Sequence, residues 1–352
     1  MSLIFQKVRE QLHHRLPFVC YNKPNSDKIV AHFQKGATLF DLDYNQCGFA
    51  FVSFDNQKRY LFPETHSDLY FETISESDFI FENTSTTNWS EADKADFEKL
   101  VQNGVDAIHQ RQFEKVVLSR KETFDVGTFD VEMVFKKLIF NYKTAFNYCI
   151  YHPQIGFWMG ATPEQFLKIE EDFIKTVALA GTQLNTGSEQ VKWNNKEIEE
   201  QQIVTDFIVD NLSLISKKVT KSNPYNIQAG SLIHIKTDIE AKIENHSDAE
   251  KIINLLHPTP ALCGFPKLES MQFILENEGY DREFYGGFLG EWNKDYLTFA
   301  ENKSDLFVNL RCMKVENKQI SLYTGCGVTK DSNPEKEFFE TVNKAQTIKK
   351  VL

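Results

Sequence analysis

The order of the apolar segments is the feature that most constrains the fold of this chain. Runs with the two-residue period of strands follow one another in local hairpins, and segments with helical spacing stand in blocks between them. A hairpin is predicted over 47–61, with its turn at Asp55-Asn56, and helices over 95–112, 131–142 and about 196–217. Because hairpin-connected strands pair antiparallel, this order predicts an α+β fold rather than a parallel sheet.

The last third of the chain is predicted to be a meander of strands followed by a helix. Strands are expected in GGFLGEW, YLTFA, LFVNLRCMKV and QISLYTGCGVT, with turns at 301–303 and 316–318. Shorter helices are expected near 249–256 and 267–279. The final helix is expected to begin at Asn333-Pro334, because Asn is a preferred cap and Pro suits the first turn.

Composition disfavours several classes of protein. The chain carries 39 Lys and Arg against 50 Asp and Glu, a net charge of −11, which argues against a general nucleic-acid binder. No apolar run approaches the ~18 residues of a membrane span, and the amino terminus has the spacing of an amphipathic helix rather than of a signal peptide. The six cysteines form no C-x-x-C pair, so reduced thiols and a cytoplasmic location are expected, with no nucleic-acid or membrane partner.

The motifs of several common chemistries are absent from the sequence. It contains no G-x-x-x-x-G-K-[ST], G-x-G-x-x-G, H-E-x-x-H or G-x-S-x-G, and its nine histidines do not cluster. Nucleotide-driven transfer, dinucleotide redox chemistry, zinc proteolysis and serine hydrolysis are therefore disfavoured. The candidate functional residues must be sought among the carboxylates and lysines.

One carboxylate of the long helix at about 196–217 is predicted to face the core. At about 100° per residue, Glu200 lies on the same side as Val204 and Phe207. A buried, unpaired carboxylate is costly, so Glu200 needs a cation, a metal ion or a raised pKa. A purely structural salt bridge across the core would satisfy it equally well.

The last helix carries a second acidic group. Glu337, Glu340 and Lys344 fall on one face, beside the apolar stripe of the helix. Two acids one turn apart suit an oxygen-binding dication such as Mg²⁺, and Lys344 is placed to hold an anion. An ordinary solvated acidic face would show the same spacing.

A lysine in the predicted strand KVVLSR is a candidate general base. Side chains alternate along a strand, so Lys115 shares a face with Val117. Burial beside valine lowers the pKa of a lysine and can make it a base. A lysine that protects an edge strand from aggregation is the alternative.

Three further segments have the composition of a ligand site. Glu164 follows Ala161-Thr162-Pro163 at a turn, and Ala180-Gly181-Thr182 ends a strand with small residues that let a ligand approach the backbone. Arg311 and the amides of Gly325-Cys326-Gly327 are suited to hold a carboxylate. The glycines are equally consistent with simple β-bulges.

Together these segments resemble the chorismate-utilising enzyme family, and within it the branch that forms isochorismate. The matches run in family order over about two thirds of the chain, from roughly residue 110 onward, and they are specific jointly rather than singly. They are KVVLSR (115–120), GATPEQFL (160–167), ALAGT (178–182), K-x-x-x-E (196–200), HI (234–235), HPTPALCG (257–264), DREFYGGFLGEW (281–292), LRC (310–312), YTGCG (323–327) and NPEKEFFETVNKA (333–345).

The resemblance implies a two-lobed α+β fold, with large, mostly antiparallel sheets flanked by helices around a central cleft. It implies a variable part of the fold at 1–95 and a chorismate-binding catalytic region at 96–352. It also implies the substrate chorismate and the cofactor Mg²⁺.

The resemblance further implies a role for each candidate residue. Lys115 would activate water for attack at ring carbon 2 of chorismate, and Glu164 would protonate the hydroxyl that leaves ring carbon 4. Glu200 and Glu340 would hold Mg²⁺ over the ring carboxylate, with Glu337 near or on the metal. The substrate-binding residues would be Ala180, Gly181, Thr182, His234, Arg311, Gly325, Cys326, Gly327 and Lys344.

The implied reaction is the isomerisation of chorismate to isochorismate, which we expect to supply menaquinone synthesis or, alternatively, a siderophore pathway. A lyase of the same family, anthranilate or salicylate synthase, is the nearest alternative, and a non-catalytic chorismate- or metal-binding regulator is another. Ala180 stands where the aminodeoxychorismate branch has a lysine, so only that branch is excluded. Gln201 follows Glu200 where many relatives have His. A monomer or weak homodimer without an obligate glutaminase subunit is expected.

Overall fold

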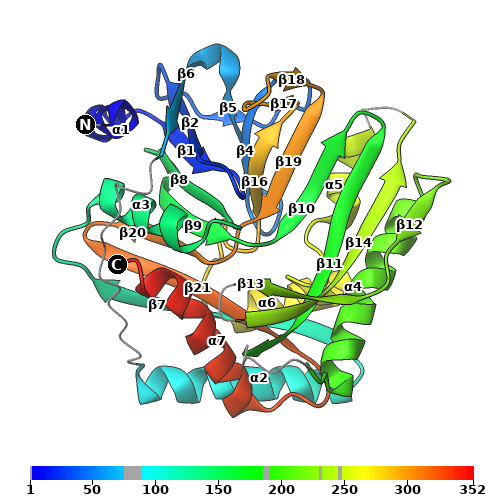
Figure 1. Cartoon of the computed structure of the whole chain (residues 1–352). Helices are drawn as coiled ribbons and strands as arrows, with labels where there is room; N and C mark the ends of the chain where they lie inside the picture. Colours follow the sequence, from blue (N-terminus) through cyan, green and yellow to red (C-terminus); the bar gives the residue numbers. More distant parts are fainter. Residues whose placement is uncertain (1, 75–88, 185–190, 230–231, 245–247) are drawn as a thin grey trace.

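The computed structural model describes residues 2–74, 89–184, 191–229, 232–244 and 248–352. Two large β-sheets stand at its centre, and their neighbouring strands pair antiparallel (Figure 1). Helices cover the outer faces of the sheets. The predicted α+β fold is confirmed.

The first sheet has nine strands, in the order β15 (Gly264–Phe265), β7 (Lys115–Asp125), β21 (Gln319–Val328), β20 (Cys312–Glu316), β9 (Gly156–Thr162), β8 (Phe146–His152), β1 (Phe18–Asn22), β2 (Lys28–Gln34) and β6 (Ser67–Thr73). The second has ten, in the order β12 (Val219–Lys221), β14 (Leu232–Lys242), β11 (Phe173–Leu184), β10 (Gln165–Glu170), β19 (Lys303–Val308), β16 (Phe288–Trp292), β4 (Gly48–Val52), β5 (Arg59–Pro63) and β3 (Phe40–Asp41), while β13 (Tyr225–Ala229) pairs with β14. A short ribbon joins β17 (Lys294–Asp295) to β18 (Ala300–Glu301).

Every predicted helix is present, with ends shifted by a few residues at most. They are α1 (Leu3–His14), α2 (Glu91–His109), α3 (Val131–Asn141), α4 (Asn195–Ser213), α5 (Asp248–Leu256), α6 (Lys267–Asn277) and α7 (Pro334–Lys349), and a 3-10 turn spans Glu64–His66. The predicted start of the last helix is confirmed, because the Asn333 side chain accepts a hydrogen bond from the Lys336 amide. None of the described helices is long and apolar enough to cross a membrane.

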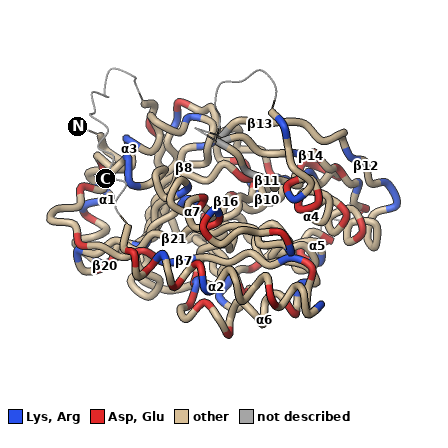
Figure 2. Tube along the Cα trace, turned by 90° about the horizontal axis from the view of Figure 1, so that it is seen from below, with Lys and Arg blue, Asp and Glu red and all other residues tan. Residues whose placement is uncertain are grey.

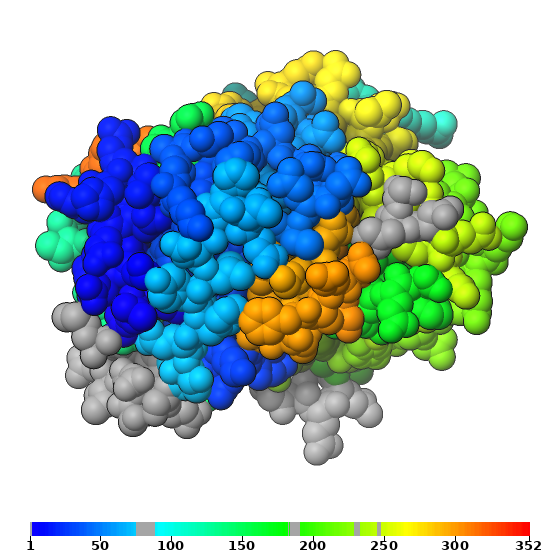
Figure 3. All heavy atoms as spheres, turned by 90° about the horizontal axis from the view of Figure 1, so that it is seen from above, coloured from blue at the N-terminus to red at the C-terminus, as the bar shows by residue number. Residues whose placement is uncertain are grey.

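The first 74 residues extend both sheets instead of forming a separate layer. Strands β1, β2 and β6 complete one sheet, and β3, β4 and β5 complete the other. In the view of Figure 3 the amino-terminal segment lies beside the orange segment that contains β17 to β19. The ring of Phe71 lies 5.4 Å from that of Phe299, which joins the two segments at this face.

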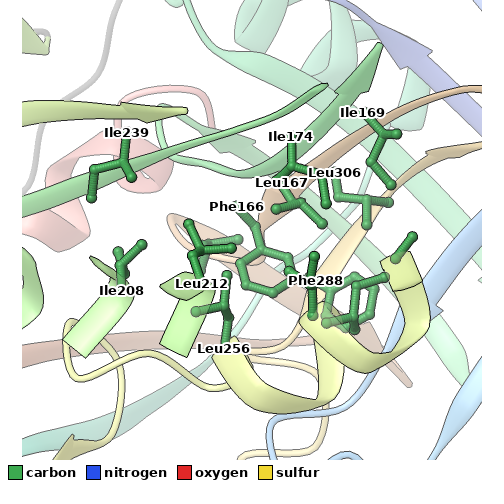
Figure 4. Packing of buried hydrophobic residues seen from close by; sticks show 14 of the residues in the cluster. Phe166, Leu167, Ile169, Ile174, Ile208, Leu212, Ile239, Leu256, Phe288 and Leu306 are labelled. Carbon is green, nitrogen blue, oxygen red and sulfur yellow. The ribbon is translucent and has the colours of Figure 1, made fainter. Parts of the chain in front are cut away.

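The second sheet buries one face against helices α4 and α5 (Figure 4). Side chains of β10, β14, β16 and β19 meet Ile208 and Leu212 of α4 and Leu256 of α5 in one apolar cluster. Because the apolar side of α4 is turned to the sheet in this way, Glu200 faces inward as its spacing predicted. Seen from below in Figure 2, Lys and Arg are interspersed with Asp and Glu along the helices that are drawn.

The prediction is wrong for two of the strands expected in the last third of the chain. Residues 296–299 of YLTFA form the turn between β17 and β18. The segment LFVNLRCMKV is divided into β19 and β20, which belong to different sheets. Arg311, between them, has a φ of 48°, a left-handed conformation that ends an extended strand. The apolar run concealed this break, which places Arg311 where the chain passes from one sheet to the other.

The packing of α4 can be tested with a pair of leucines. Leu212 is 1% exposed in the apolar cluster, whereas Leu214 at the end of the same helix is 75% exposed. Leu212→Ala should lower the free energy of unfolding by about 2–5 kcal/mol, because it leaves a cavity. Leu214→Ala should change it by about 0.5 kcal/mol or less. Urea denaturation of both variants measures the difference, and equal losses would contradict the described orientation of α4.

Candidate active site

A cavity lies between the two sheets, beside the point where the chain passes from one to the other. Its volume is about 70 Å³, room for a few water molecules. Strands β7, β21, β11 and β14, helices α4 and α7 and four loop segments surround it. The lining residues include Val117, Glu164, Ala180, Gly181, Glu200, His234, Tyr285, Arg311, Gly325, Cys326, Gly327, Glu340 and Lys344.

Most of the residues predicted from the sequence therefore lie around one cavity. Lys115 is set behind the wall, in contact with Glu200. Glu337 lines a neighbouring, wider hollow of about 1080 Å³, whose lining it shares with Glu340. The side chain of Thr182 lies outside the described part of the structure.

Lys115 and Glu200 form a buried ion pair at the base of the cavity. The Lys115 Nζ lies 3.0 Å from Glu200 Oε1, and the lysine is 0% exposed, although the pair lacks the alignment of a hydrogen bond. Burial alone would raise the pKa of Glu200, but the Lys115 and Lys196 cations lower it overall. Of the alternatives that the sequence left open for Glu200, the structure shows a cation.

Gly327 makes this ion pair accessible from the cavity. A Cβ atom at Gly327 would lie 2.2 Å from Glu200 Oε1 and 3.3 Å from Lys115 Cε. A side chain there would displace the carboxylate. The glycine is therefore required by the close approach of α4 to β21.

Glu164 has the properties of a general acid. It lies after β9 and is 9% exposed. Burial raises its pKa to about 7, against the opposing effect of the Arg311, Lys344 and Lys115 cations. A carboxylic acid that keeps its proton near neutral pH can give it to a leaving hydroxyl.

Arg311 is a cation without a partner in the described part of the chain. Its guanidinium lines the cavity, and no hydrogen bond or ion pair to a described residue satisfies it. Burial lowers its pKa, yet a guanidinium stays charged at any physiological pH. A cation in this position favours an incoming anion, and the fork of N–H donors of a guanidinium suits a carboxylate.

The amides of Gly325 and Gly327 also face the cavity side of β21. These residues stand opposite Ser119 and Val117 of β7, whose own N–H groups point to the outer edge of the sheet. Such pairs in an antiparallel ladder exchange no hydrogen bonds, so both glycine amides point away from β7. The Lys344 ammonium donates to the Gly325 carbonyl at 2.9 Å on that same side.

Cys326 differs from its two neighbours. It stands opposite Leu118, where an antiparallel ladder forms its hydrogen bonds, so its amide is used within the sheet. Its side chain is 1% exposed and packs in an apolar cluster with Phe97 and Phe338. The two glycine amides, and not that of Cys326, are left for a ligand.

His234 is paired with Thr182 in the sheet, next to Gly181, and is uncharged. Its Nδ1 donates to the Gly181 carbonyl at 3.2 Å, and burial together with the Arg311 and Lys344 cations lowers its pKa to about 3. The register of β11 against β14 shifts between Ala180 and Thr182, which is a β-bulge at Gly181. Its φ of 71° suits a glycine.

Each carboxylate predicted to bind a metal is paired with a lysine. Glu340 contacts Lys344 at 2.6 Å, Glu337 contacts Lys196, and Glu200 contacts Lys115. Among the described residues, no three His, Cys, Asp or Glu side chains are grouped closely enough to hold a metal ion.

Two of these three carboxylates nevertheless fit a hard cation. Glu200 and Glu340 line the same cavity, and carboxylate oxygens are the donors that Mg²⁺ prefers. Glu337 faces the adjoining hollow. In this structure the paired lysines supply the positive charge that the three carboxylates require.

Three residues of the site were not predicted from the sequence. Tyr285 and Arg282 line the cavity, and Lys196 lines the adjoining hollow. All three lie in stretches that carry the resemblance, DREFYGGFLGEW and K-x-x-x-E. Motif membership was the available signal, but nothing in the local pattern showed which side chains point inward.

Comparison with known proteins agrees with this site. A model of the family described as "Chorismate binding enzyme" matches residues 55–352. The chain belongs to the chorismate-binding enzyme family. It is 30% identical over 264 residues to the isochorismate synthase EntC of Escherichia coli (strain K12), a match that covers 72% of this chain and 66% of that protein. The chain thus matches just under two thirds of the length of this relative.

Two solved structures share the fold of this chain. One is the putative 2,3-dihydroxybenzoate-specific isochorismate synthase DhbC from Bacillus anthracis, with a TM-score of 0.78, 21% identity and 98% coverage of both chains. The other is the menaquinone-specific isochorismate synthase MenF from Escherichia coli, with a TM-score of 0.79, 20% identity and coverage of 96% of this chain and 88% of that one. The predicted two-sheet fold of the family is confirmed.

The raised pKa of Glu164 predicts a pH dependence of stability. Between its ordinary value of 4.5 and about 7, the folded protein keeps a proton that the unfolded chain has lost. Stability from this group is therefore full below pH 4.5 and falls as the pH rises to 7, by on the order of 3 kcal/mol. Glu164→Gln has no such proton, so the stability of the wild type relative to this variant should fall across the interval.

Urea denaturation of both proteins at several pH values between 4.5 and 8 measures this difference. Other titrating groups contribute alike to the two proteins and largely cancel. A constant difference across the interval would show that Glu164 titrates at its ordinary value.

Proposed function

We propose that this protein converts chorismate to isochorismate with Mg²⁺. The observation that carries the proposal is the pair formed by Glu164, an acid with a pKa of about 7, and Arg311, a guanidinium without a partner among the described residues, in one cavity. An acid and an anion site are what an anionic substrate with a poor leaving group needs. The names of the relatives, which include isochorismate synthases, support the choice of reaction.

The proposed reaction needs one base and one acid. Lys115, in its neutral amine form, takes a proton from water as the water oxygen bonds to ring carbon 2. The ring double bonds shift, and the hydroxyl on carbon 4 leaves as water with the proton of Glu164. One water is added and one is released, so the product is an isomer of the substrate. Glu200 is the group that holds the Lys115 side chain in place.

The carboxylates of the substrate have donors in the cavity. Arg311 offers a fork of N–H groups, and Lys344 and the amides of Gly325 and Gly327 lie on the cavity side of β21. The phenol of Tyr285 lines the same cavity and adds a further donor. His234, uncharged, adds polar contact without adding charge.

Glu200 and Glu340 would hold Mg²⁺, with Glu337 beside them. When bound, the cation would neutralise the ring carboxylate and orient the ring. Three lysines now balance these three carboxylates. Binding of a dication alone, or of a dianionic substrate alone, would change the net charge of the site by two units. Binding of both together leaves the net charge unchanged.

Variants of the proposed base and acid test the mechanism. Lys115→Gln and Glu164→Gln should each lower kcat by about 10²–10⁴-fold, because neither amide can move the proton. Chorismate binding should stay within about tenfold, since both groups act mainly in the transition state. Product chromatography measures turnover, and fluorescence or calorimetry measures binding.

Lys23→Gln is the matched control, because Lys23 is also a buried lysine paired with a glutamate, Glu291, but neither residue lines the cavity. Its turnover should equal that of the wild type once the folded fraction is taken into account. Near-normal turnover in Lys115→Gln would remove Lys115 from the mechanism. Formation of anthranilate with ammonia, or of salicylate and pyruvate, would replace the proposed isomerisation with a lyase reaction.

Removal of the metal tests the charge balance. Chorismate affinity should fall at least about tenfold in EDTA, and Mg²⁺ affinity should fall by the same factor without chorismate, because linkage is reciprocal. Glu200→Ala and Glu340→Ala should lose turnover even at high Mg²⁺. Calorimetric titration of each ligand with and without the other measures the coupling. Equal chorismate affinity with and without Mg²⁺ would make the three carboxylates structural.

The destination of the product is a separate proposal. The two structural relatives are named as specific for 2,3-dihydroxybenzoate and for menaquinone respectively. Menaquinone supply stays our prediction. Restored menaquinone in a bacterium that lacks its own isochorismate synthase would support it.

A further inference from the structure

The outer edge of strand β7 is closed by side chains instead of a full strand. Along this edge β15 pairs only with Lys115 and Val116, and the Val117 amide donates to the Cys263 carbonyl at 2.8 Å. Beyond that point no strand is hydrogen-bonded to the edge in the described structure. An uncovered edge would leave backbone groups without partners inside the protein.

Glu278 and Arg282 supply the missing partners. Arg282 Nη2 donates to the Val117 carbonyl at 2.7 Å, and Glu278 Oε1 accepts from the Ser119 amide at 2.7 Å and from its hydroxyl at 3.0 Å. These are the next carbonyl and the next amide along the outer edge of β7. The two side chains thus provide one donor and one acceptor, as an adjacent strand would.

The pair is itself rigid and buried. Arg282 Nε donates to Glu278 Oε2 at 2.7 Å, a second guanidinium nitrogen contacts Glu278 Oε1, and the two side chains are 3% and 1% exposed. The guanidinium also lies over the ring of Phe54, 4.3 Å from its centroid. A bidentate pair in this setting has few alternative geometries.

Arg282 also joins β7 to the other wall of the cavity. Its Nη1 donates to the Leu262 carbonyl at 3.0 Å, and both Leu262 and Val117 line the cavity. Lys115 stands two residues before Val117 on the same face of β7. The carbonyl of Lys115 is held in turn by the Ser270 hydroxyl at 2.9 Å.

We propose that Glu278 and Arg282 are positioning residues for this reaction: together they replace a neighbouring strand at the outer edge of β7 and thereby fix Lys115 and the Val117 wall of the cavity. The proposal rests on the proposed function for its effect on turnover, while the ordering of β7 does not depend on it. Neither residue gives or takes a proton in the reaction. Their effect acts through the placement of Lys115.

Arg282→Lys keeps the charge and loses the simultaneous bonds to Val117, Leu262 and Glu278. We expect kcat to fall at least about tenfold, because a base displaced by a fraction of an ångström loses much of its effect. KM for chorismate should stay within about threefold, since the carboxylate donors lie elsewhere. Hydrogen exchange of the segment 115–121 should become faster, while that of β1, five strands away in the same sheet, stays unchanged.

Two variants of Glu278 distinguish the effect of its hydrogen bond to the Ser119 amide from the effect of burying a side chain of similar volume. Glu278→Gln keeps an oxygen for the Ser119 amide, whereas Glu278→Leu keeps the volume and loses the acceptor. Turnover should therefore be higher in Glu278→Gln than in Glu278→Leu, by about tenfold. Exchange of the 115–121 segment should follow the same order.

Glu291→Gln is the control for loss of a buried ion pair. Glu291 is 0% exposed and does not line the cavity. It is paired with Lys23, which is distant from it in the sequence. It should lower thermal stability comparably and leave kcat per folded molecule within about twofold. A fall in kcat as large as that of Arg282→Lys would show that any lost ion pair has this effect, and would overturn the proposal.

The remaining outcomes also decide the matter. Unchanged kcat in folded Arg282→Lys and Glu278→Leu, or unchanged exchange of 115–121, would overturn it. Should these variants fail to fold, the wild type still carries the test: a Ser119 amide that exchanges as fast as an open edge would overturn the proposal, and a protected one would support it. If the wild type makes no isochorismate, the proposed function fails, and the exchange measurements still decide whether the pair orders β7.

Discussion

The structure depends on charges that are buried between two sheets and balanced there in pairs. Lys115 with Glu200 ties β7 to α4, and Lys196 with Glu337 ties α4 to α7. Burying a single charge costs several kcal/mol, so these elements are stable together only while each lysine has its carboxylate. Arg311 and Glu164 are the exceptions: Arg311 has no partner among the residues that the structure describes, and burial raises the pKa of Glu164 to about 7. The cavity therefore offers a cation that can bind an anion and an acid that can transfer a proton.

Periodicity predicted the parts of this arrangement that lie within one element. The inward side of α4, with Glu200 on it, follows from 3.6 residues per turn, and the start of α7 follows from the capping chemistry of Asn333. The antiparallel pairing followed from the hairpins. None of these predictions requires knowledge of what lies across the core.

What the sequence could not show depends on contacts between distant segments. One left-handed residue at Arg311 divides an unbroken apolar run between two sheets, and its side chain reaches the cavity for that reason. The lysine partner of each carboxylate is another such case, because only the folded chain brings Lys115 to Glu200 across 85 positions of sequence. The proposed role of Glu278 is a third case, because no local sequence pattern shows that a side chain will bond to the edge of a distant strand. The Mg²⁺ site stays a prediction.

The small size of the cavity bears on the chemistry in two ways. The pKa of Glu164 is raised by burial against three nearby cations, so water that entered freely would return the acid to its ordinary range and remove its proton at neutral pH. The same exclusion of water strengthens the attraction of Arg311 for a carboxylate. Lys344 and Glu340 both line the cavity and pair with each other, so an anion bound there would compete with Glu340 for Lys344. The exchange of that internal ion pair for a pair with the ligand keeps the charge balanced as the cavity fills, while the rigid edge of β7 keeps Lys115 where the new occupant will meet it.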